Sequence, residues 1–594
     1  NDRPQNITLV ATQGLVCFLI FFFSSTVSAA TAPPNFDPGA LLEQLNKQPL
    51  TQPARPPLPA ETQTRELLTG FEFRELPGHL VPIATAFLQP YIGKEVKINS
   101  LLMALYAHLQ SRDPHDNYIF IAKKIATGYV FIAQKVIFDG VTIEANTTRS
   151  NDIFLANIMG YKLIPHAPLD YFQIERNATI VSEIPGIISQ FNMKPGAQPG
   201  SSNVHLSTDQ GSVYVGSIVE DNSTTHTLGE WTTRADVATY NQLGLGDIVR
   251  LTGQLTQKSN SAGLDASAVV HPSGLRAGFN LSTFHYGYKS DTDTVSYGTE
   301  LHSTAHYTGV SNSLGLNLLY PLVRTDEMRQ NLTLDLNYNT SVSDVSINQQ
   351  TTVFGTSSSL VSESDAFYHL SELLIKKAAV GTNGALALPF SRATINYQLA
   401  VTVGNASQDL TSVALQDSNG ERTLGGFIKG NLNAQYSQAV AINETTYEGV
   451  LMGELQVTHR NLAGPEKAYL GGIYKMQAWE PQAIGGSQMA YFRGQLARSF
   501  ISAPGVVLGV FAELATIQVS HRNYLASVGN QTIPVDTSWQ TLSDMGAVFN
   551  YTLSPNISLS TTIAKKLGRD ITVNGATQDS GDGVRGWLTA RITF

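Results

Sequence analysis

The sequence predicts a mainly β chain that crosses a membrane as an antiparallel β-barrel. Four consecutive segments within Gly229–Ser282 alternate apolar and polar residues, so each predicted strand has one apolar and one polar face. Charged residues make up 14% of the chain, well below the roughly 25% of a soluble domain. After the N-terminal leader no apolar stretch is long enough for a helical span, so insertion by strands is expected.

The alternation suits two architectures, a soluble sandwich and a transmembrane barrel. Strands of roughly 10 residues match a membrane span, whereas strands in globular proteins are usually nearer 5–6 residues. The connections Asn241–Asp247 and His271–Gly274 are tight, as periplasmic turns would be, whereas Lys289–Tyr297 is longer and polar, as an extracellular loop would be. Strand length and connections together favour the barrel.

The N-terminus has the pattern of a secretory signal peptide. An apolar run, Leu15–Phe23, is followed by Val27-Ser28-Ala29, which has the small-x-small form of a signal peptidase site. We therefore expect residues 1–29 to be removed on export. The only cysteine, Cys17, lies in this segment, so the mature chain is expected to have no thiol that could oxidise in the periplasm.

Residues 30–60 are predicted to hold a short helix and a linker. Asp37 can cap a helix over Asp37–Lys47, and an apolar stripe follows along it at Leu41, Leu42 and Leu45. The proline-rich Pro49–Ala60 predicts an extended, semi-rigid linker. Taken alone, this stretch is better interpreted as a disordered leader.

Two small α/β modules are predicted next, at residues 61–146 and 147–210. The first has helical patterns at Leu80–Phe87 and Ile98–Leu109. Two strands are expected to follow, Tyr129–Ile132 and Val141–Glu144, with Asp139-Gly140 as a hairpin turn. The second repeats the mixture, with a helix near Leu169–Ile180 and a final strand Asn203–Ser207.

Five motifs in order resemble those of the two-partner secretion outer-membrane transporters, of the haemolysin-activator and filamentous-haemagglutinin-transporter type. They are Pro90-Tyr91-Ile92-Gly93-Lys94; Gly128-Tyr129 with Gln134 and Asp139-Gly140; Leu169–Ile187; Pro195-Gly196 with Pro199-Gly200-Ser201; and Glu466-Lys467-Ala468-Tyr469-Leu470-Gly471-Gly472. The resemblance covers nearly the whole chain, from about residue 37 to residue 594.

The resemblance implies two periplasmic POTRA modules, a 16-stranded barrel over residues 211–594, and an Asp37–Lys47 helix that plugs the lumen. It implies an outer-membrane pore of a Gram-negative bacterium that recognises an unfolded exoprotein in the periplasm and exports it. The other expected partners are outer-membrane lipids and, during biogenesis, the barrel assembly machinery. Two alternatives stay open, an assembly factor of the same superfamily and a passive porin.

In the resembled family a Val-Arg-Gly-Tyr motif lies at the tip of the sixth extracellular loop, which folds back into the lumen. The matching positions here are Met476, Gln477, Ala478 and Trp479, so the tip lacks the family's arginine. A rival match, Phe492, Arg493 and Gly494, lies too far along the chain for the usual spacing, so Arg493→Ala is expected to have little effect. Val584-Arg585-Gly586-Trp587 is similar in sequence to the Val-Arg-Gly-Tyr motif, but it falls in the predicted closing strand.

The middle and the end of the barrel predict further features. The polar segments Val342–Asp365 and Leu410–Arg422 are expected to be extracellular loops. The last strand alternates up to the terminal Phe594, and the resemblance predicts a barrel insertion signal there, at Trp587, Ile592 and Phe594.

The sequence carries no motif that indicates an enzyme. It contains no Gly-x-Ser-x-Gly, His-Glu-x-x-His or Walker sequence, and its 13 histidines show no metal-ligand spacing. We therefore expect no catalysis, no cofactor and no metal. A formal net charge of −9 argues against nucleic-acid binding.

Overall fold

The computed structural model describes residues 66–594 with short internal gaps, at 111–117, 199, 297–298, 326, 355–358, 389–392, 443–444, 501, 529–530, 536, 569–570, 574–575 and 579–582. The predicted signal peptide and the predicted plug helix Asp37–Lys47 therefore lie outside the described residues.

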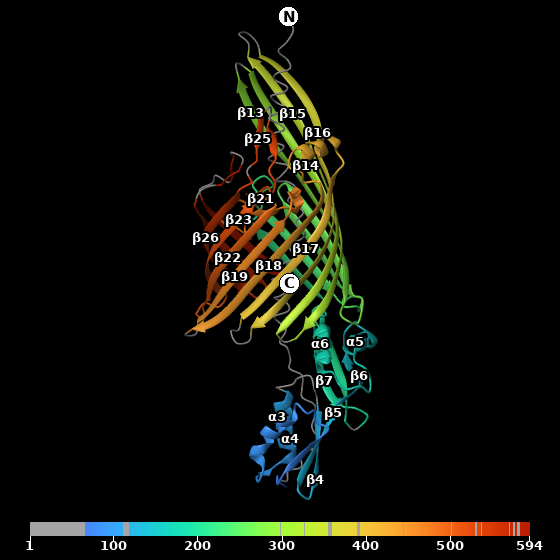
Figure 1. The fold of residues 1–594 in the computed structure, drawn as a ribbon. Helices are drawn as coiled ribbons and strands as arrows, with labels where there is room; N and C mark the ends of the chain where they lie inside the picture. Colours follow the sequence, from blue (N-terminus) through green and yellow to red (C-terminus); the bar gives the residue numbers. More distant parts are fainter. Residues whose placement is uncertain are drawn as a thin grey trace.

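Sixteen antiparallel strands close into a barrel, as predicted (Figure 1). The closure pairs the last strand, β30, with the first, β9. In chain order the strands are β9 (Tyr214–Asp221), β10 (Thr232–Tyr240), β11 (Ile248–Thr256), β12 (Ser259–Val269), β13 (Arg276–Ser296), β14 (Thr299–Arg324), β15 (Met328–Phe354), β16 (Ser359–Leu388), β17 (Ala393–Gln408), β18 (Gly425–Ile442), β19 (Thr445–Thr458), β22 (Gln488–Ser499), β23 (Val506–Gln518), β26 (Trp539–Ser554), β27 (Ile557–Leu567) and β30 (Val584–Thr593).

The two faces of the barrel follow the two-residue period of the sequence. On β23, Leu508, Val510 and Leu514 point outward and are about half exposed, whereas Glu513 between them is buried on the lumen side. The four strands first recognised in the sequence behave in the same way. Their outward, exposed residues include Val237, Leu251, Leu255, Phe279 and Leu281. Within the described part of the chain, no helix is both long and apolar enough to cross a membrane.

The first module packs two helices against a three-stranded sheet ordered β2-β5-β4. Hydrogen bonds from Lys124 and Tyr129 join β1 to this sheet and hold the pKa of Glu66 below its ordinary value. The elements are β1 (Glu66–Leu67), β2 (Phe71–Arg74), α3 (Val81–Leu88), η2 (Gln89–Tyr91), β3 (Glu95–Val96), α4 (Ile98–Gln110), β4 (Tyr118–Ile125) and β5 (Gly128–Lys135).

The second module has a sheet ordered β6-β8-β7 covered by α5 and α6. Both helices begin at side-chain caps, Asn151 and Asp170, each of which accepts a backbone N–H of the first turn. The elements are β6 (Ile137–Asn146), α5 (Asp152–Met159), α6 (Tyr171–Ser182), β7 (Ile187–Pro195) and β8 (Ser201–Gln210).

The structure moves the boundary between the modules. Residues 137–146, assigned from the sequence to the first module, form β6 of the second, where they pair in parallel with β8. The predicted hairpin turn Asp139-Gly140 is also wrong, because it lies inside β6 at a register shift. A bulge and a turn draw on the same local residue types, and only pairing with a strand some sixty residues away distinguishes them.

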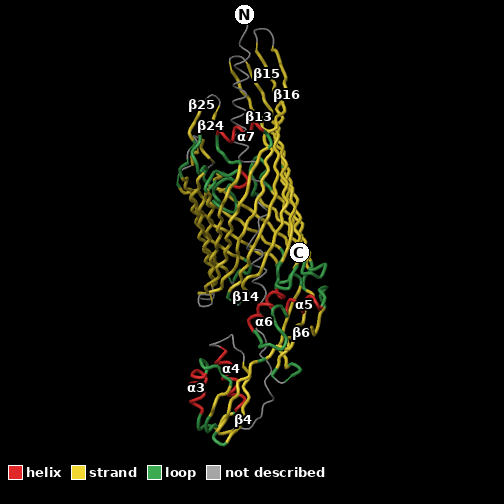
Figure 2. Tube along the Cα trace, turned by 45° about the vertical axis from the view of Figure 1, so that its right-hand side comes forward, coloured by secondary structure: helices red, strands yellow, loops and turns green. Residues whose placement is uncertain are grey.

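Two of the predicted extracellular loops are strands instead. Residues 289–296 continue β13, and residues 342–354 and 359–365 belong to β15 and β16, which rise above the rest of the barrel (Figure 2). Leu410–Arg422 contains a short helix, α7 (Thr411–Asn419). Strand segments that extend beyond the bilayer do not contact lipid, so their outward residues need not be apolar. Their Ser/Thr-rich composition is therefore the same as that of a loop.

The second module docks on the turns at one mouth of the barrel (Figure 1). Arg324 at the end of β14 is buried and donates to Glu183 at the end of α6, at 2.7 Å. Arg176 of α6 donates to the carbonyl of Pro321, also at 2.7 Å. Two apolar residues of the module, Ile180 and Ile184, approach glycines in the neighbouring turns, Gly274 and Gly246, so closely that a Cβ there would collide with them.

Candidate functional site

The segment 459–487, which connects β19 to β22, lies inside the barrel, and we call it the lumen loop. Its side chains and backbone contact inward-facing residues of β16, β18, β23, β26 and β30, strands from opposite parts of the wall. The loop contains η3 (Gly464–Glu466) and a small hairpin of β20 (Ala468–Leu470) and β21 (Ile484–Gly486).

At the base of the lumen loop, Glu466 is held by two lysines of the wall. Its carboxylate is 2.7 Å from Nζ of Lys377 on β16 and 2.8 Å from Nζ of Lys429 on β18. Gln456 on β19 donates to the carbonyl of Glu466 at 3.2 Å. The Glu466 side chain is 1% exposed, so this carboxylate is a buried anion balanced by cations that come from the barrel.

The predicted tip residues Met476–Trp479 lie in the turn that joins β20 to β21, and we call this segment the tip of the lumen loop. The backbone N–H of Gln477 donates to Glu513 Oε2 at 2.7 Å, and that of Ala478 donates to Asp544 Oδ2 at 2.9 Å. The carbonyl of Gln477 accepts the indole N–H of Trp587 at 2.7 Å. The wall therefore binds the tip mainly through its backbone.

The Gly-Gly pair before the tip allows the loop to turn tightly. Gly471 and Gly472 have φ values of +104° and +110°, a region that side chains disfavour. A Cβ on Gly471 would lie 2.0 Å from the carbonyl oxygen of Glu480. The turn is completed by hydrogen bonds from Gly472 to the Trp479 carbonyl and from the Trp479 N–H to Met476. The motif is thus a steric requirement of the folded-back loop.

Trp479 closes the tip against the wall. Its ring is 1% exposed, packs in a cluster with Met489, Phe511 and Leu542, and has Nζ of Lys566 at 4.4 Å from its centroid. Such a contact combines a large apolar area with a cation–π attraction.

We expect Trp479→Ala to destabilise the docked loop far more than Gln477→Ala. Removing a buried tryptophan costs about 3–5 kcal/mol, whereas Gln477→Ala keeps both backbone contacts and loses one side-chain hydrogen bond to Ile473. Thermal unfolding of the two purified variants, at matched barrel levels, measures the difference. Equal shifts in Tm would contradict the assigned role of Trp479.

The rival tip Phe492-Arg493-Gly494 lies in strand β22 and does not form a loop tip. Phe492 points outward, but Arg493 is only 8% exposed and pairs with Glu513 at 3.0 Å. This side chain contacts the carboxylate that binds Gln477, so from the structure we expect Arg493→Ala to weaken the docking of the tip. Arg585 likewise lies in the closing strand β30, as expected.

The predicted insertion residues do not share one face. Ile592 and Phe594 are exposed on the outside, whereas Trp587 is buried in the lumen and binds the loop tip. Trp587 therefore has a structural contact in the lumen that the insertion prediction did not include. The role of Ile592 and Phe594 in insertion stays a prediction.

The wall residues that bind the lumen loop were missed in the sequence. Two of them were detectable, because Glu513 is the only charged residue of β23 and Asp544 is the only one of β26. A single acidic residue in an otherwise uncharged strand, on the polar side of the alternation, indicates a lumen contact. Lys377, Lys429 and Lys566 carry no comparable signal.

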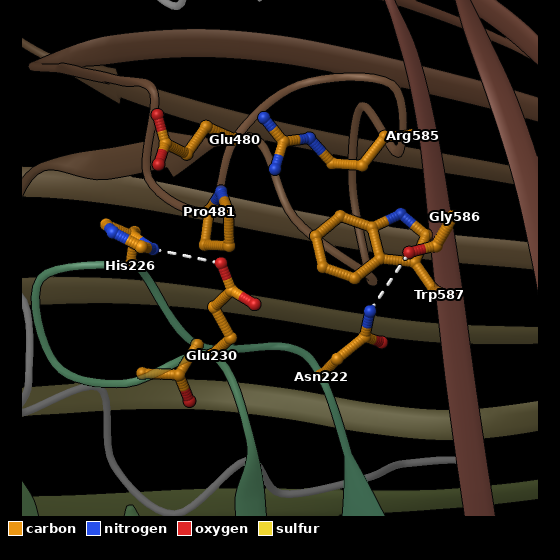
Figure 3. Close-up of a pocket in the computed structure, with 9 residues that line it drawn as sticks. Asn222, His226, Glu230, Glu480, Pro481, Arg585, Gly586 and Trp587 are labelled. Atoms are coloured by element: carbon orange, nitrogen blue, oxygen red, sulfur yellow. Dashed lines mark hydrogen bonds and ion pairs between the residues drawn. The ribbon is translucent and has the colours of Figure 1, made fainter. Parts of the chain in front are cut away.

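A cavity of about 340 Å³ opens where the lumen loop leaves the tip, beside the closing seam (Figure 3). Only five residue pairs, Thr589↔Asp221 to Thr593↔Ser217, join β30 to β9. Asn222 extends this ladder with its side chain, donating to the Gly586 carbonyl at 3.0 Å and accepting the Leu588 N–H at 2.8 Å. Among the described residues, no three His, Cys, Asp or Glu side chains are placed to hold a metal ion.

Comparisons with known proteins agree with this architecture. The family model described as haemolysin secretion/activation protein ShlB/FhaC/HecB matches residues 200–514. The heme/hemopexin transporter protein HuxB of Haemophilus influenzae is 22% identical over 260 residues, 42% of this chain and 44% of HuxB. The outer membrane transporter CdiB of Dickeya dadantii is 25% identical over 360 residues, 59% of this chain and 58% of CdiB. The matched part thus spans about half the length of these relatives.

Solved structures show the same fold over nearly the whole chain. CdiB from Escherichia coli superimposes with a TM-score of 0.62 at 16% identity, covering 97% of this chain and 98% of that one. CdiB from Acinetobacter baumannii gives a TM-score of 0.61 at 12% identity, covering 99% and 98%. At these identities the likeness concerns the fold alone.

Proposed function

The chain belongs to the haemolysin secretion/activation family ShlB/FhaC/HecB, and we propose that it exports a partner exoprotein across the outer membrane through its barrel. The observation that carries this proposal is the lumen loop. Sixteen strands enclose a lumen wide enough for a channel, and the chain occupies it with a loop held by hydrogen bonds and ion pairs. Polar contacts of this kind can be exchanged for water, so the loop is suited to move when cargo passes.

The two modules are proposed to be POTRA modules that receive the cargo in the periplasm. Each presents a three-stranded sheet with two edges, β2 and β4 in the first and β6 and β7 in the second. An unfolded segment can add to such an edge through main-chain hydrogen bonds. The second module packs directly on the barrel mouth, which places a captured segment next to the pore.

The remaining parts of the proposal concern the surroundings of the barrel. Its outward apolar residues would contact outer-membrane lipids, and its closing strand would be read by the barrel assembly machinery. The segment Asp37–Lys47 would plug the lumen at rest together with the lumen loop. No ATP is available outside the inner membrane, so folding of the cargo at the cell surface would drive export.

Deleting residues 66–135 tests the proposal. This deletion removes the first module and leaves the docked second module and the barrel intact, so we expect export to be abolished while conductance in planar bilayers persists. The cargo to follow is a large, repeat-rich secreted protein, which a search of the genes that neighbour this one would identify. Normal secretion of that protein by the truncated chain would refute the role of the first module.

The intact chain provides the control for the competing functions. A passive porin would conduct ions but would secrete no partner even when complete. An assembly factor would, on deletion of the whole gene, lower the amounts of other outer-membrane barrels. Export by the intact chain with unchanged levels of other barrels is the result that we expect.

A further inference from the structure

Four charged residues form a row across the lumen wall beneath the tip. Arg493 on β22 lies directly opposite Glu513 on β23, Glu513 opposite Asp544 on β26, and Asp544 opposite Lys566 on β27. Residues opposite one another in an antiparallel sheet have Cβ atoms about 4.5–5.5 Å apart. We call these four residues the charge row, in which a basic side chain stands at each end and two carboxyl groups lie between them.

Successive tip residues lie over successive members of the charge row. Gln477 donates its backbone N–H to Glu513, Ala478 donates its N–H to Asp544, and the ring of Trp479 lies against Lys566. The three contacts therefore cross three neighbouring strands in the order of the loop sequence. This correspondence makes the charge row a receptor for the tip.

The tip itself brings no charge to the receptor. Gln477 is neutral, and the guanidinium next to Glu513 belongs to Arg493 of the wall, with Nη1 at 3.0 Å from Oε1. Arg493 is fixed by a second hydrogen bond to Gln495 at 2.8 Å, and it lies over the ring of Phe511, 4.1 Å from its centroid. The hydroxyl of Tyr491 donates to the same carboxylate at 2.6 Å.

The buried carboxylate of Glu513 is balanced by this cation. An ionised acceptor forms hydrogen bonds roughly twice as strong as a neutral one. Arg493 therefore strengthens the contact between Glu513 and Gln477 without touching the loop. When the tip leaves, Arg493 and Glu513 stay paired with each other, so no unpaired charge is left buried in the wall.

We propose that Arg493 is a positioning residue that keeps the Glu513 carboxylate aimed at the tip, so that the tip of the lumen loop docks as a neutral segment and can leave the charge row without separating an ion pair. The consequence for export rests on the proposed function. The position of the loop does not rest on the proposed function, because it can be measured without cargo.

The test measures how often the tip leaves the lumen. Cys17→Ser removes the natural cysteine, and Ala478→Cys places a reporter thiol at the tip, where Ala478 is buried. Intact cells are treated with a bulky polyethylene glycol maleimide that reaches only a released loop. Against this reporter chain, Arg493→Ala should label at least tenfold faster, and Arg493→Lys should stay close to it.

A rescue separates the charge effect from a general loss of packing. Asp544 Oδ1 is buried without a hydrogen-bond partner among the described residues, so it can accept a donor from an arginine at the tip. Adding Gln477→Arg to Arg493→Ala should therefore restore slow labelling. Arg498→Ala is the matched control, because it removes an exposed arginine from the same strand and should change nothing.

Several outcomes would overturn the inference. Equal labelling rates in Arg493→Ala and Arg493→Lys would contradict the proposal. Failure of Gln477→Arg to slow the labelling of Arg493→Ala would contradict it too. If Arg493→Ala does not fold, Glu513→Gln takes its place, since it removes the charge but keeps the shape, and slow labelling of that variant would also refute the proposal. If the labelling rates are as expected but the chain exports nothing, the proposed export function is refuted and the role of Arg493 is not.

Discussion

Glu466→Gln should release the base of the lumen loop and strongly lower the thermal stability of the barrel. The substitution leaves the ammonium groups of Lys377 and Lys429 buried without the carboxylate that lies between them. Removing one partner of a buried ion pair costs about 3–5 kcal/mol. We expect a lower unfolding temperature on heat-modifiability gels and greater conductance in planar bilayers.

Glu454→Gln is the matched control for this prediction. Glu454 on β19 pairs with Lys475 of the lumen loop. Both side chains are partly exposed, Glu454 at 25% and Lys475 at 30%. Such pairs contribute about 0–1 kcal/mol to stability. Lys429→Gln combined with Glu466→Gln should recover part of the loss, because it removes one of the two unpaired cations. If Glu466→Gln and Glu454→Gln behave alike, the base of the loop is not held by its charges.

Arg324→Ala should loosen the second module from the barrel. The guanidinium of Arg324 donates to Glu183 of the module and to three groups of the barrel turn, the carbonyls of Val323 and Gln330 and the side chain of Asn331, at 2.6–2.9 Å. Its loss leaves Glu183 without its closest cation, again at a cost of about 3–5 kcal/mol. Export should fall sharply, because the module no longer presents cargo at the mouth.

Distances between spin labels test this directly. Ile164 of the second module and Leu553 at the end of β26 are both exposed, so labelled cysteines are tolerated at these sites in a Cys17→Ser chain. The distance distribution should broaden in Arg324→Ala and remain narrow in Arg250→Gln, which breaks an ion pair between partly exposed side chains within the barrel. A narrow distribution in both variants would show that the apolar contacts of Ile180 and Ile184 hold the module without Arg324.

Much of the fold could be predicted because its signals are local. The alternation in Gly229–Ser282 depends only on the geometry of one strand at a time, and β10 to β13 formed where it placed them. The helices near Leu80–Phe87 and Leu169–Ile180 formed for the same reason, since apolar spacing and, in the second helix, the Asp170 cap act within a few residues. Predictions failed where two segments had to meet, as when β6 joined the second module through β8.

The sequence by itself determined that this chain forms a barrel preceded by two modules, and that Met476–Trp479 follows a glycine pair able to fold the loop back. Only the tertiary structure decided how that tip is held. Arg493, Glu513, Asp544 and Lys566 lie on four different strands, and they form a row because the register of each strand pair places them opposite one another. Register is set by strand pairing and barrel closure over the whole chain, so no local pattern could have shown that the missing arginine of the tip is replaced by an arginine of the wall.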